Sequence, residues 1–369
     1  MKVLIVANDS DGLIKFRGLL LKNFIQSSYE VACIIPLNDK CNRSRAENEL
    51  KNVGCKLFFV RMDQRGMNPN NDIKLFLNYK KIIKSWMPQL VLTYTIKPNI
   101  YAGLACRFLK VPYVENITGL GTAFQNDGIL KKMVIFMYKQ ALVKTKLVFF
   151  ENIENRDVMV NLGIISKEKS HVLAGAGVDL EYFSYLDYPD EEKKTRFLFI
   201  GRVMKEKGIN ELFFALENLN SNGIKCTLDI LGRYEENYSK KLKKYEDEGW
   251  LKYYGVQEDV RPYIKRCHCF VLPSWHEGMA NTNLENASCG RPIITSRIHG
   301  CLEAVIEGKT GYLCESKNVE SLIKAMQRFI ELPYEEKKKM GIEGRKYMEI
   351  EFDKKKVVAE TLNVIKSRI

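Results

Sequence analysis

The most pointed arrangement of reactive side chains is a pair of glutamates eight residues apart, Glu277 and Glu285. The segment around them follows a short apolar run, crosses a glycine-containing loop and enters a helical pattern near Asn281 and Thr282. Backbone N–H groups and the positive end of the helix dipole favour a phosphate at such a helix start. The pair therefore fits a nucleotide-sugar site, with one carboxylate on each side of the phosphates. Two glutamates at this spacing also arise often by chance.

Two cations occupy the corresponding place in an earlier strand–helix unit. Arg202 follows an apolar run that ends at Gly201, and Lys207 precedes the next helical pattern. Fixed positive charges at this place stabilise the negative charge that grows on a diphosphate leaving group as a sugar bond breaks. Either residue could equally be an ordinary surface charge.

Two short patterns are candidate metal sites. Asp9 and Asp11 follow the first apolar run at a spacing that can hold a divalent cation on a diphosphate, and the alternative is helix capping. Cys267, His268 and Cys269 alternate along a strand pattern, and no second ligand pair follows nearby in the sequence. We therefore expect no metal ion and no cofactor.

The elements that must position these residues are short apolar runs alternating with helical patterns. Such an alternation predicts parallel sheets with right-handed crossovers. The strand patterns are Val3–Ala7, Glu30–Ile35, Lys56–Val60, Leu90–Tyr94, Tyr113–Asn116, Leu147–Glu151, then Phe197–Ile200, Thr227–Leu231, Leu251–Tyr254, Cys269–Leu272, Pro292–Thr295 and Gly311–Leu313. The helical patterns cover 16–27, 46–53, 72–86, 101–109, 130–145, 209–220, 238–248, 260–266, 283–289, 302–307 and 319–332.

The pattern restarts past the middle of the chain, so we expect an α/β protein with two doubly wound, Rossmann-like domains facing each other across a cleft. The expected domains are 1–178 and 179–352, and residues 353–369 should form a helix that crosses back to the first domain.

Composition excludes several protein classes. The chain has 369 residues, of which 46% are hydrophobic, and no apolar run is long enough to cross a membrane. The ten cysteines are scattered, which favours buried thiols in a reducing, cytoplasmic compartment. The net charge of +13 indicates a polyanionic partner, namely nucleic acid, a nucleotide-sugar diphosphate or an anionic membrane surface. No nucleic-acid-binding motif supports the first of these.

The segment Leu130–Lys144 is basic and amphipathic. Such a helix can lie on an anionic leaflet as a peripheral membrane contact. Alternatively, it packs on a sheet with its lysines directed outward.

Taken in order, these motifs resemble glycosyltransferase family 4, and the likeness runs over almost the whole chain. The matching stretches are Phe-Ile-Gly-Arg-x4-Lys-Gly ending at Gly208, Asp-Ile-Leu-Gly ending at Gly232, Gly255, Pro-Ser-x2-Glu-Gly-x6-Glu ending at Glu285, Gly-Arg-Pro-Ile-Ile-Thr ending at Thr295, and the interdomain-like segment Gly175–Phe183. Thr95–Tyr101 and Asn116–Gly121 are similar to a subgroup that builds lipid-linked oligosaccharides for O-antigen, capsule or N-glycan pathways.

The resemblance implies roles for the donor site in the second domain. Arg202 and Lys207 would hold the diphosphate, Glu277 would address the transferred sugar, and Glu285 would bind the ribose. Asn281 and Thr282 would contribute to donor binding at the helix start.

Further roles follow from the same resemblance. Backbone at Gly232 and around Val256 would line the base, and Gly12 of the first domain would approach the phosphates. Lys97, Asn116 and Thr118 are candidate contacts of the acceptor or the sugar. Thr118 departs from the pattern, because many relatives carry a histidine there.

The implied enzyme is a retaining, metal-independent glycosyltransferase in which the leaving phosphate takes the acceptor's proton. We expect it to move an N-acetylhexosamine such as GalNAc from a UDP-sugar onto an undecaprenyl-diphosphate-linked saccharide, peripherally at the inner face of the cytoplasmic membrane. The alternatives are a sugar-nucleotide epimerase on the same fold or a transferase that uses a GDP-sugar. A dinucleotide oxidoreductase is disfavoured, because no complete Gly-x-Gly-x-x-Gly follows the first strand pattern.

Overall fold

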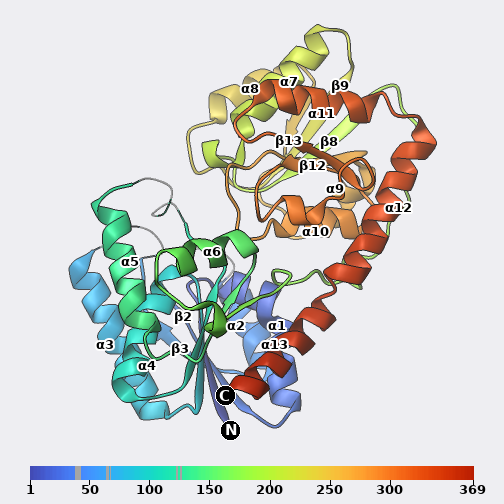
Figure 1. Ribbon diagram of the computed structural model, residues 1–369. Helices are drawn as coiled ribbons and strands as arrows, with labels where there is room; N and C mark the ends of the chain where they lie inside the picture. The colour runs from blue at the N-terminus through green and yellow to red at the C-terminus, as the bar shows by residue number, and fades with distance from the viewer. Residues whose placement is uncertain (38–42, 64–65, 67, 122–123, 125–126) are drawn as a thin grey trace. The chain divides into compact units, whose positions relative to one another are not determined.

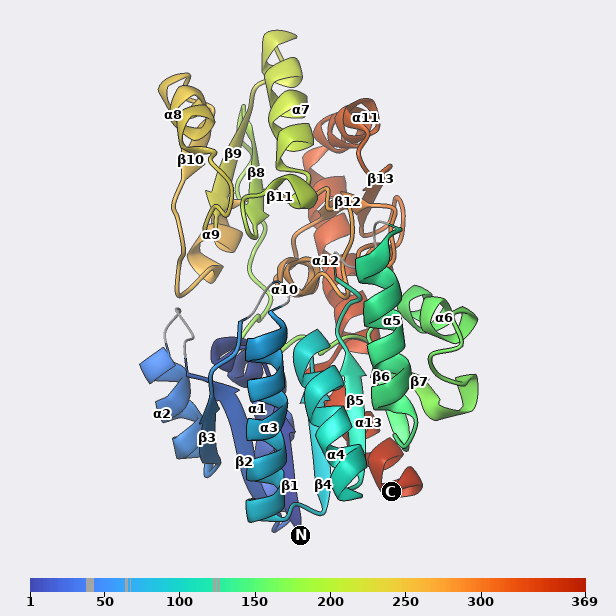
Figure 2. The ribbon, with the colours of Figure 1, turned by 90° about the vertical axis from the view of Figure 1, so that its left-hand side faces the viewer.

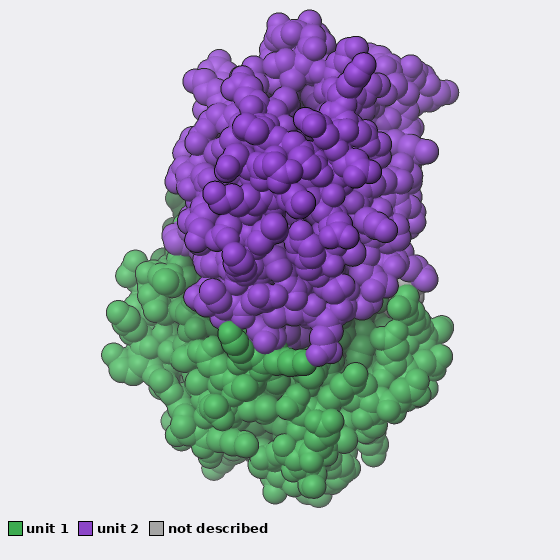
Figure 3. All heavy atoms as spheres, turned by 90° about the vertical axis from the view of Figure 1, so that its right-hand side faces the viewer, with its two compact units in different colours: residues 1–176, 355–369 green, residues 177–354 purple. Residues whose placement is uncertain are grey.

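The computed structural model describes residues 1–37, 43–63, 66, 68–121, 124 and 127–369 (Figure 1). The chain divides into two compact units. Unit 1 comprises Met1–Ala176 and Lys355–Ile369, and unit 2 comprises Gly177–Lys354 (Figure 3). Each unit is built around its own parallel sheet.

Unit 1 contains a seven-stranded parallel sheet with the order β3-β2-β1-β4-β5-β6-β7. Its strands are β1 (Lys2–Val6), β2 (Glu30–Pro36), β3 (Lys56–Val60), β4 (Leu90–Tyr94), β5 (Tyr113–Ile117), β6 (Leu147–Phe150) and β7 (Ser170–Val172). The order reverses at β1, which pairs with β2 on one side and β4 on the other. Ligands of open α/β sheets bind at the carboxyl ends of the strands beside such a reversal.

Helices cover both faces of this sheet, as Figures 1 and 2 show. One face carries α3 (Pro69–Trp86), a π-helical turn η1 (Pro98–Ala102), α4 (Gly103–Leu109), α5 (Ile129–Leu142) and α6 (Ile153–Asn161). The other carries α1 (Ser10–Gln26), α2 (Arg43–Val53) and the final helix α13 (Lys354–Arg368). Successive side chains of β1 point to opposite faces of the sheet. Leu4 packs against the face that carries α3 to α6, and Ile5 packs against the face that carries α1, α2 and α13.

The final helix belongs to unit 1. Val357, Val358 and Ile365 are buried in the apolar cluster that also contains α1. The His171 imidazole lies 2.7 Å from the Glu360 carboxylate, which ties β7 to the same helix.

Unit 2 repeats the plan with six parallel strands in the order β10-β9-β8-β11-β12-β13. They are β8 (Thr195–Ile200), β9 (Cys226–Leu231), β10 (Leu251–Tyr253), β11 (Cys269–Leu272), β12 (Ile293–Ser296) and β13 (Gly311–Cys314). The helices are α7 (Ile209–Ser221), α8 (Ser239–Asp247), α9 (Arg261–Arg266), α10 (Asn281–Ser288), α11 (Val319–Ile330) and α12 (Tyr334–Glu351), with short 3-10 turns η4 (Lys205–Lys207) and η5 (Leu302–Ala304). Here the reversal lies at β8, between β9 and β11.

The prediction of two doubly wound, Rossmann-like domains is confirmed, and each of the twelve predicted strand patterns lies on an observed strand. Helix starts follow ordinary capping chemistry. Asp9 accepts the Gly12 N–H at the start of α1, Asn68 accepts the Asn71 N–H at the start of α3, and Asn318 caps α11. The predicted pattern at 302–307 is helical only over η5.

A buried arginine anchors the start of unit 2. Arg291 is fully buried and donates to the carbonyl oxygens of Leu186 and Asp187, at 3.2 and 2.7 Å. It also donates to those of Ile264 and Lys265 at the end of α9, at 2.8 and 3.2 Å. Carbonyl acceptors thus satisfy a buried charge without a carboxylate, and they fix the segment before β8 against the sheet.

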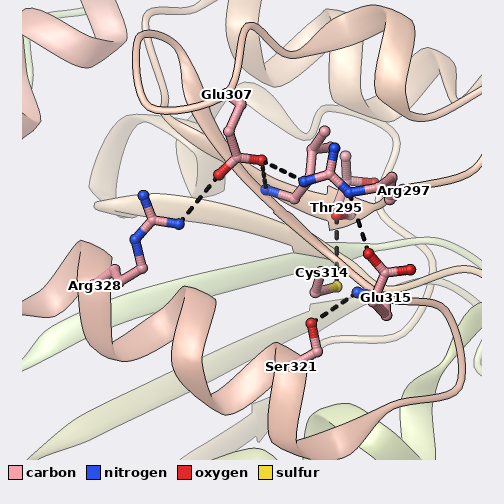
Figure 4. A network of polar contacts seen from close by, with 8 residues as sticks. Thr295, Arg297, Glu307, Cys314, Glu315, Ser321 and Arg328 are labelled. Atoms are coloured by element: carbon pink, nitrogen blue, oxygen red, sulfur yellow. Dashed lines mark hydrogen bonds and ion pairs between the residues drawn. The ribbon is translucent and has the colours of Figure 1, made fainter.

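The edge of the unit 2 sheet is held by surface ion pairs (Figure 4). Glu307 accepts from Arg297 at 3.1 Å and from Arg328 at 3.3 Å, and Arg297 also contacts Glu315 at 3.2 Å. These pairs join the ends of β12 and β13 to α11, and exposed pairs of this kind contribute about 0–1 kcal/mol each. Across the described residues, no helix is both long enough and apolar enough to span a membrane.

Candidate functional site

The loops after β8 and β11 bring together a lysine, a glutamate and a serine. Lys207 forms an ion pair with the Glu277 carboxylate, and the Ser274 hydroxyl donates to the same carboxylate oxygen at 2.8 Å. The Lys207 and Glu277 side chains are 17% and 12% exposed. Because β11 pairs with β8, the strand at which the order reverses, this cluster lies where open α/β sheets bind ligands. The sequence prediction named Lys207 and Glu277 but did not include Ser274.

Two glycines allow the backbones of neighbouring loops to lie close together at this cluster. Gly208 has φ +69°, and a Cβ there would lie 2.0 Å from the Pro273 carbonyl oxygen. Gly300 has φ +88°, and its Cβ would lie 2.8 Å from the Glu277 carbonyl oxygen. Any larger residue would push the Glu277 loop away. Gly208 was visible in the Lys-Gly motif, but nothing in the sequence connected Gly300 to this loop.

Arg202, like Lys207, follows the end of β8, but it forms a separate ion pair. Its guanidinium lies 3.2 Å from the Glu235 carboxylate, which also contacts Arg233 at 3.4 Å. The Arg202 side chain is 42% exposed. Glu235, which lies beyond β9, was not expected from the sequence, because only the fold brings it beside Arg202.

Helix α10 begins at Asn281, as the sequence predicted for its phosphate-favouring helix start. Its N-cap residue, Ala280, makes no side-chain capping hydrogen bond. Thr282 lies in the first turn, and its carbonyl oxygen accepts from the Asn286 amide at 2.8 Å. Glu285 lies one turn further and is 4% exposed. Glu277 and Glu285 therefore occupy the loop before the helix and the helix itself.

Backbone packing at the ends of β8, β9 and β10 surrounds Gly232. This residue has φ +129°, and a Cβ there would lie 1.9 Å from the Gly201 carbonyl oxygen. Its N–H donates to the Gly255 carbonyl oxygen at 2.7 Å. Val256 follows and is 67% exposed. The two residues expected to line a base are thus neighbours at one end of the sheet.

His276 lies beside the cluster, with its Nε2 atom 3.7 Å from the Glu206 carboxylate. Burial, together with the nearby Lys207 and Arg202 charges, lowers the pKa of the His276 imidazole below its ordinary value, against the opposing effect of the Glu206 and Glu277 carboxylates. The ring is therefore neutral at neutral pH. His268 is structural: its Nδ1 accepts the Arg196 N–H at 2.9 Å.

The site residues predicted in unit 1 make contacts with other residues of unit 1. Gly12 lies in the first turn of α1, where its N–H donates to Asp9 at 2.8 Å. Lys97 pairs with Asp72 at 2.8 Å. Asn116 is buried, and Thr118 follows β5 half-buried.

Asn116 belongs to a buried amide network at the ends of β4 and β5. Its side chain donates to the Thr93 carbonyl oxygen at 3.1 Å. Asn99 accepts from the Thr93 hydroxyl at 2.7 Å and donates to the Asn116 carbonyl oxygen at 2.9 Å. Asn99 lies in the π-helical turn η1, a feature that often occurs at functional sites and that the sequence did not predict.

Family models match both halves of the chain. Residues 2–152 match the model described as glycosyl transferase 4-like, and residues 187–347 match glycosyl transferases group 1. Together they cover most of unit 1 and most of unit 2.

Curated relatives extend over most of the chain as well. An α-1,3-N-acetylgalactosaminyltransferase of Campylobacter jejuni that acts on N,N'-diacetylbacillosaminyl-diphospho-undecaprenol is 25% identical over 348 residues, covering 90% of each chain. An Escherichia coli enzyme named UDP-Gal:α-D-GlcNAc-diphosphoundecaprenol α-1,3-galactosyltransferase is 28% identical, covering 79% of each chain.

Solved structures share the fold at low sequence identity. The Anabaena protein HepE, crystallised with UDP and glucose, has a TM-score of 0.79 at 14% identity and covers all of both chains. A glycosyltransferase from Rickettsia africae also has a TM-score of 0.79, at 16% identity, covering 99% of this chain and 98% of its own.

Proposed function

This chain is a glycosyltransferase of the two-domain, family 4 type, and from that premise we propose that unit 2 holds its nucleotide-sugar donor. The reaction proposed is transfer of an N-acetylhexosamine, such as N-acetylgalactosamine, from a UDP-sugar to a saccharide linked to undecaprenyl diphosphate. Unit 1 would receive this acceptor. The setting proposed is assembly of a bacterial surface polysaccharide or lipid-linked glycan.

The observation that carries the proposal is the cluster of Lys207, Glu277 and Ser274 at the ends of β8 and β11. An ammonium and a carboxylate, both largely buried, face each other beside the reversal of strand order. A diphosphate attracts the ammonium, and the carboxylate can accept hydrogen bonds from sugar hydroxyls. In the bond that breaks, Lys207 would therefore serve the diphosphate side and Glu277 the sugar side.

The remaining donor contacts follow along α10 and the strand ends. The first turn of α10 presents backbone N–H groups toward a phosphate, and Glu285 behind it would accept the ribose hydroxyls. Arg202 would leave Glu235 for the diphosphate, because its guanidinium is already partly exposed. Gly232 and Val256 would border the base. The UDP in the Anabaena structure and the UDP-galactose in the Escherichia coli enzyme's name support this choice of nucleotide.

The chemical step proposed is retention by attack from the same face as the departing phosphate. The bond between the anomeric carbon and the diphosphate oxygen breaks, and a bond to the acceptor hydroxyl oxygen forms. The acceptor's proton passes to the departing phosphate oxygen, so no protein base is needed. Lys207 and Arg202 would stabilise the charge that develops on the diphosphate, the task that a metal ion performs in other transferases.

The acceptor is proposed from the relatives. The Campylobacter jejuni and Escherichia coli enzymes both act on sugars linked to diphospho-undecaprenol. An acceptor with so long a prenyl chain resides in the membrane. The protein would therefore work as a peripheral protein at the inner face of the cytoplasmic membrane.

The experiment supplies UDP-N-acetylgalactosamine labelled in the sugar, with and without a lipid extract containing undecaprenyl-diphosphate-linked saccharide. We expect the label to enter the organic phase only when the lipid is present. Conversion of the labelled nucleotide sugar into its epimer without lipid would contradict the proposal and indicate an epimerase. Transfer from the GDP-sugar instead would contradict the choice of nucleotide alone.

A further inference from the structure

The outer surface of α3, α4 and α5 in unit 1 exposes large apolar side chains. They are Ile73 (57% exposed), Leu77 (53%), Phe108 (67%), Ile129 (86%), Leu130 (48%), Met133 (40%) and Phe136 (61%). We refer to the outer surface of these three helices as the α3–α5 face. Figure 2 shows the helices side by side on one face of the sheet. The described large apolar side chains of α1, α2 and α13, on the other face of the sheet, are not exposed in this way.

The apolar side chains on this face are continuous from helix to helix. The Phe76 ring of α3 meets the Phe108 ring of α4 at a centroid distance of 5.9 Å. Phe108 and Phe136 then line a groove of about 490 Å³ between α4 and α5. The groove is otherwise lined by Leu104, Arg107, Met137 and Gln140. Exposed apolar surface that runs over several elements indicates a binding surface.

The charge of the same face is mostly positive, although the exposed Asp127 carboxylate, just before α5, pairs with Lys131 at 2.8 Å. Its helices carry eight basic residues, Lys74, Lys80, Lys81, Lys84, Arg107, Lys131, Lys132 and Lys139. Their one acidic residue is Asp72, which is buried and paired with Lys97. Basic residues flank the apolar side chains: Lys132 adjoins Met133 on α5, Arg107 adjoins Phe108 on α4, and Lys80 of α3 lies 5.7 Å from the Phe108 ring centroid.

The combination of exposed apolar and basic side chains indicates which partner would bind the α3–α5 face. A second copy of the chain would bring two strongly basic faces together, which like-charge repulsion disfavours. A bilayer with anionic headgroups supplies both partners at once, hydrocarbon for the apolar side chains and phosphates for the lysines. Lysine stems also reach upward from a partly inserted helix to the headgroups.

We propose that the α3–α5 face docks unit 1 onto a bilayer of anionic phospholipids. Met133, Phe136 and Phe108 lie at the boundary between headgroups and hydrocarbon, and lipid chains enter the groove between α4 and α5. Arg107, held at 2.8 Å by the Gln140 carbonyl oxygen, presents its remaining N–H groups to a lipid phosphate at the edge of that groove. The inference rests on the proposed function only in that a membrane-resident acceptor makes such docking useful.

The test is co-sedimentation of the full chain with vesicles of equal phosphatidylglycerol and phosphatidylcholine, compared with vesicles of phosphatidylcholine alone. We expect binding to the anionic vesicles only. The variant Lys132→Glu/Lys139→Glu should bind them at least about 30-fold more weakly, since each basic residue near the surface contributes substantially. Its matched control, Lys240→Glu/Lys243→Glu, makes the same charge change on exposed α8 of unit 2 and should bind as the wild type does.

A second pair of variants separates the apolar contribution. Phe108→Ser/Phe136→Ser should weaken vesicle binding by about 10-fold or more, because two large apolar side chains no longer leave water. Phe214→Ser, which removes a phenylalanine 54% exposed on α7, should leave it unchanged. Equal loss in Phe214→Ser, or full binding by Phe108→Ser/Phe136→Ser, would overturn the proposal. A concentration-dependent dimer of the wild type would also overturn the proposal, if Phe108→Ser/Phe136→Ser abolished that dimer but still bound vesicles.

Activity distinguishes a failure of this inference from a failure of the proposed function. Transfer to a water-soluble, short-chain analogue of the lipid-linked acceptor should be unaffected in Lys132→Glu/Lys139→Glu, whereas transfer to acceptor in anionic vesicles should fall. Vesicle binding without transfer to either acceptor would contradict the function and leave the docking face standing. Transfer to both acceptors at equal rates in wild type and variant would contradict the docking face alone.

Discussion

Lys207 and Glu277 form an ion pair in which each side chain neutralises the charge of the other. A diphosphate that binds near Lys207 must compete with the Glu277 carboxylate for the ammonium. The Ser274 hydroxyl donates to the same carboxylate at 2.8 Å and would hold it if Lys207 turned to a diphosphate. The ion pair therefore holds the Lys207 ammonium in a partly buried site in which neither charge is uncompensated.

Replacing Glu277 with glutamine tests this competition. The variant keeps the side-chain volume and an oxygen for Ser274 but frees Lys207 for the diphosphate. We expect UDP to bind as tightly as in the wild type or more tightly, while sugar transfer falls by about 100-fold or more because the sugar end loses its carboxylate. Calorimetric titration with UDP and initial rates of transfer measure the two effects.

The control for that variant is Glu206→Gln, which removes a half-buried carboxylate next to His276 but outside the cluster. Its transfer rate should remain close to that of the wild type. Parallel loss of UDP binding and of transfer in Glu277→Gln would contradict the assignment of Glu277 to the sugar end.

At the scale of elements, the sequence predicted the strands well because buried parallel strands are short apolar runs between turn residues. It missed α12 for a physical reason. This helix is largely charged and contains Gly341 and Gly344, which are unfavourable inside a helix. In the structure a Cβ at Gly341 would lie 2.1 Å from the Gly290 carbonyl oxygen, so the glycines let α12 pack against the end of α10.

Two further elements were missed, α6 and β7. The α6 sequence has no continuous apolar stripe, and β7 has three residues, so neither gives a periodic signal. For the site, the sequence predicted the residues that follow strands but not their partners. Glu235 and Gly300 act through contacts between loops, and such contacts depend on the tertiary fold. Ser274 contacts Glu277 within the loop after β11, and the geometry of that loop was not predicted.

The close approach at Gly208 predicts a large effect of a single methyl group. In Gly208→Ala the new Cβ meets the Pro273 carbonyl oxygen, so the loops after β8 and β11 must separate. We expect a loss of more than about 2 kcal/mol of unfolding free energy and loss of transfer. Urea denaturation followed by circular dichroism measures the first.

Gly249→Ala is the matched control. Gly249 also has a left-handed backbone, with φ +79°, but among the described residues other than its chain neighbours no atom lies within 4 Å of its Cβ position. It should lose only the conformational cost of about 1 kcal/mol. Equal losses in the two variants would show that the Pro273 contact is unimportant.

Glu115 of β5 predicts an unusual pH dependence. It is fully buried, and both carboxylate oxygens lack hydrogen-bond partners in the part of the chain that the structure describes. Burial raises the pKa of the Glu115 carboxyl well above its ordinary range. Above pH about 4.3 the unfolded chain releases this proton while the folded chain keeps it, so the contribution of Glu115 to stability falls as pH rises.

Glu115→Met should therefore stabilise the protein relative to the wild type, and the gain should increase from pH 5 to pH 8 by up to about 1.4 kcal/mol per pH unit. Glu115→Gln should show the same pH trend with a smaller gain, because the amide remains buried. Denaturant titrations at several pH values measure the difference. A difference independent of pH would contradict a protonated Glu115.

At the scale of the whole molecule, we propose that two parts of the chain with its net charge of +13 bind anions. Unit 2 carries fixed cations at the strand ends, and unit 1 carries the basic α3–α5 face. If lysine and arginine neutralise the leaving diphosphate, transfer does not depend on a divalent ion.

Chelation tests that expectation. Transfer should proceed at an unchanged rate in EDTA, measured with the labelled donor and the lipid-linked acceptor. Activity that EDTA removes and Mg²⁺ restores would contradict the metal-free mechanism. It would also direct attention to Asp9 and Asp11 at the start of α1, the Asp-x-Asp pair of unit 1.

The central claim is that Lys207 serves the departing diphosphate, and one comparison of rates tests it most directly. Lys207→Ala and Lys205→Ala remove lysines from the same 3-10 turn, but Lys205 is exposed and lies 5.4 Å from the Trp275 ring centroid. With UDP-N-acetylgalactosamine and lipid-linked acceptor, kcat/KM should fall by about 100-fold or more in Lys207→Ala and change little in Lys205→Ala. Equal rates in Lys207→Ala and the wild type, with the fold intact, would contradict the account.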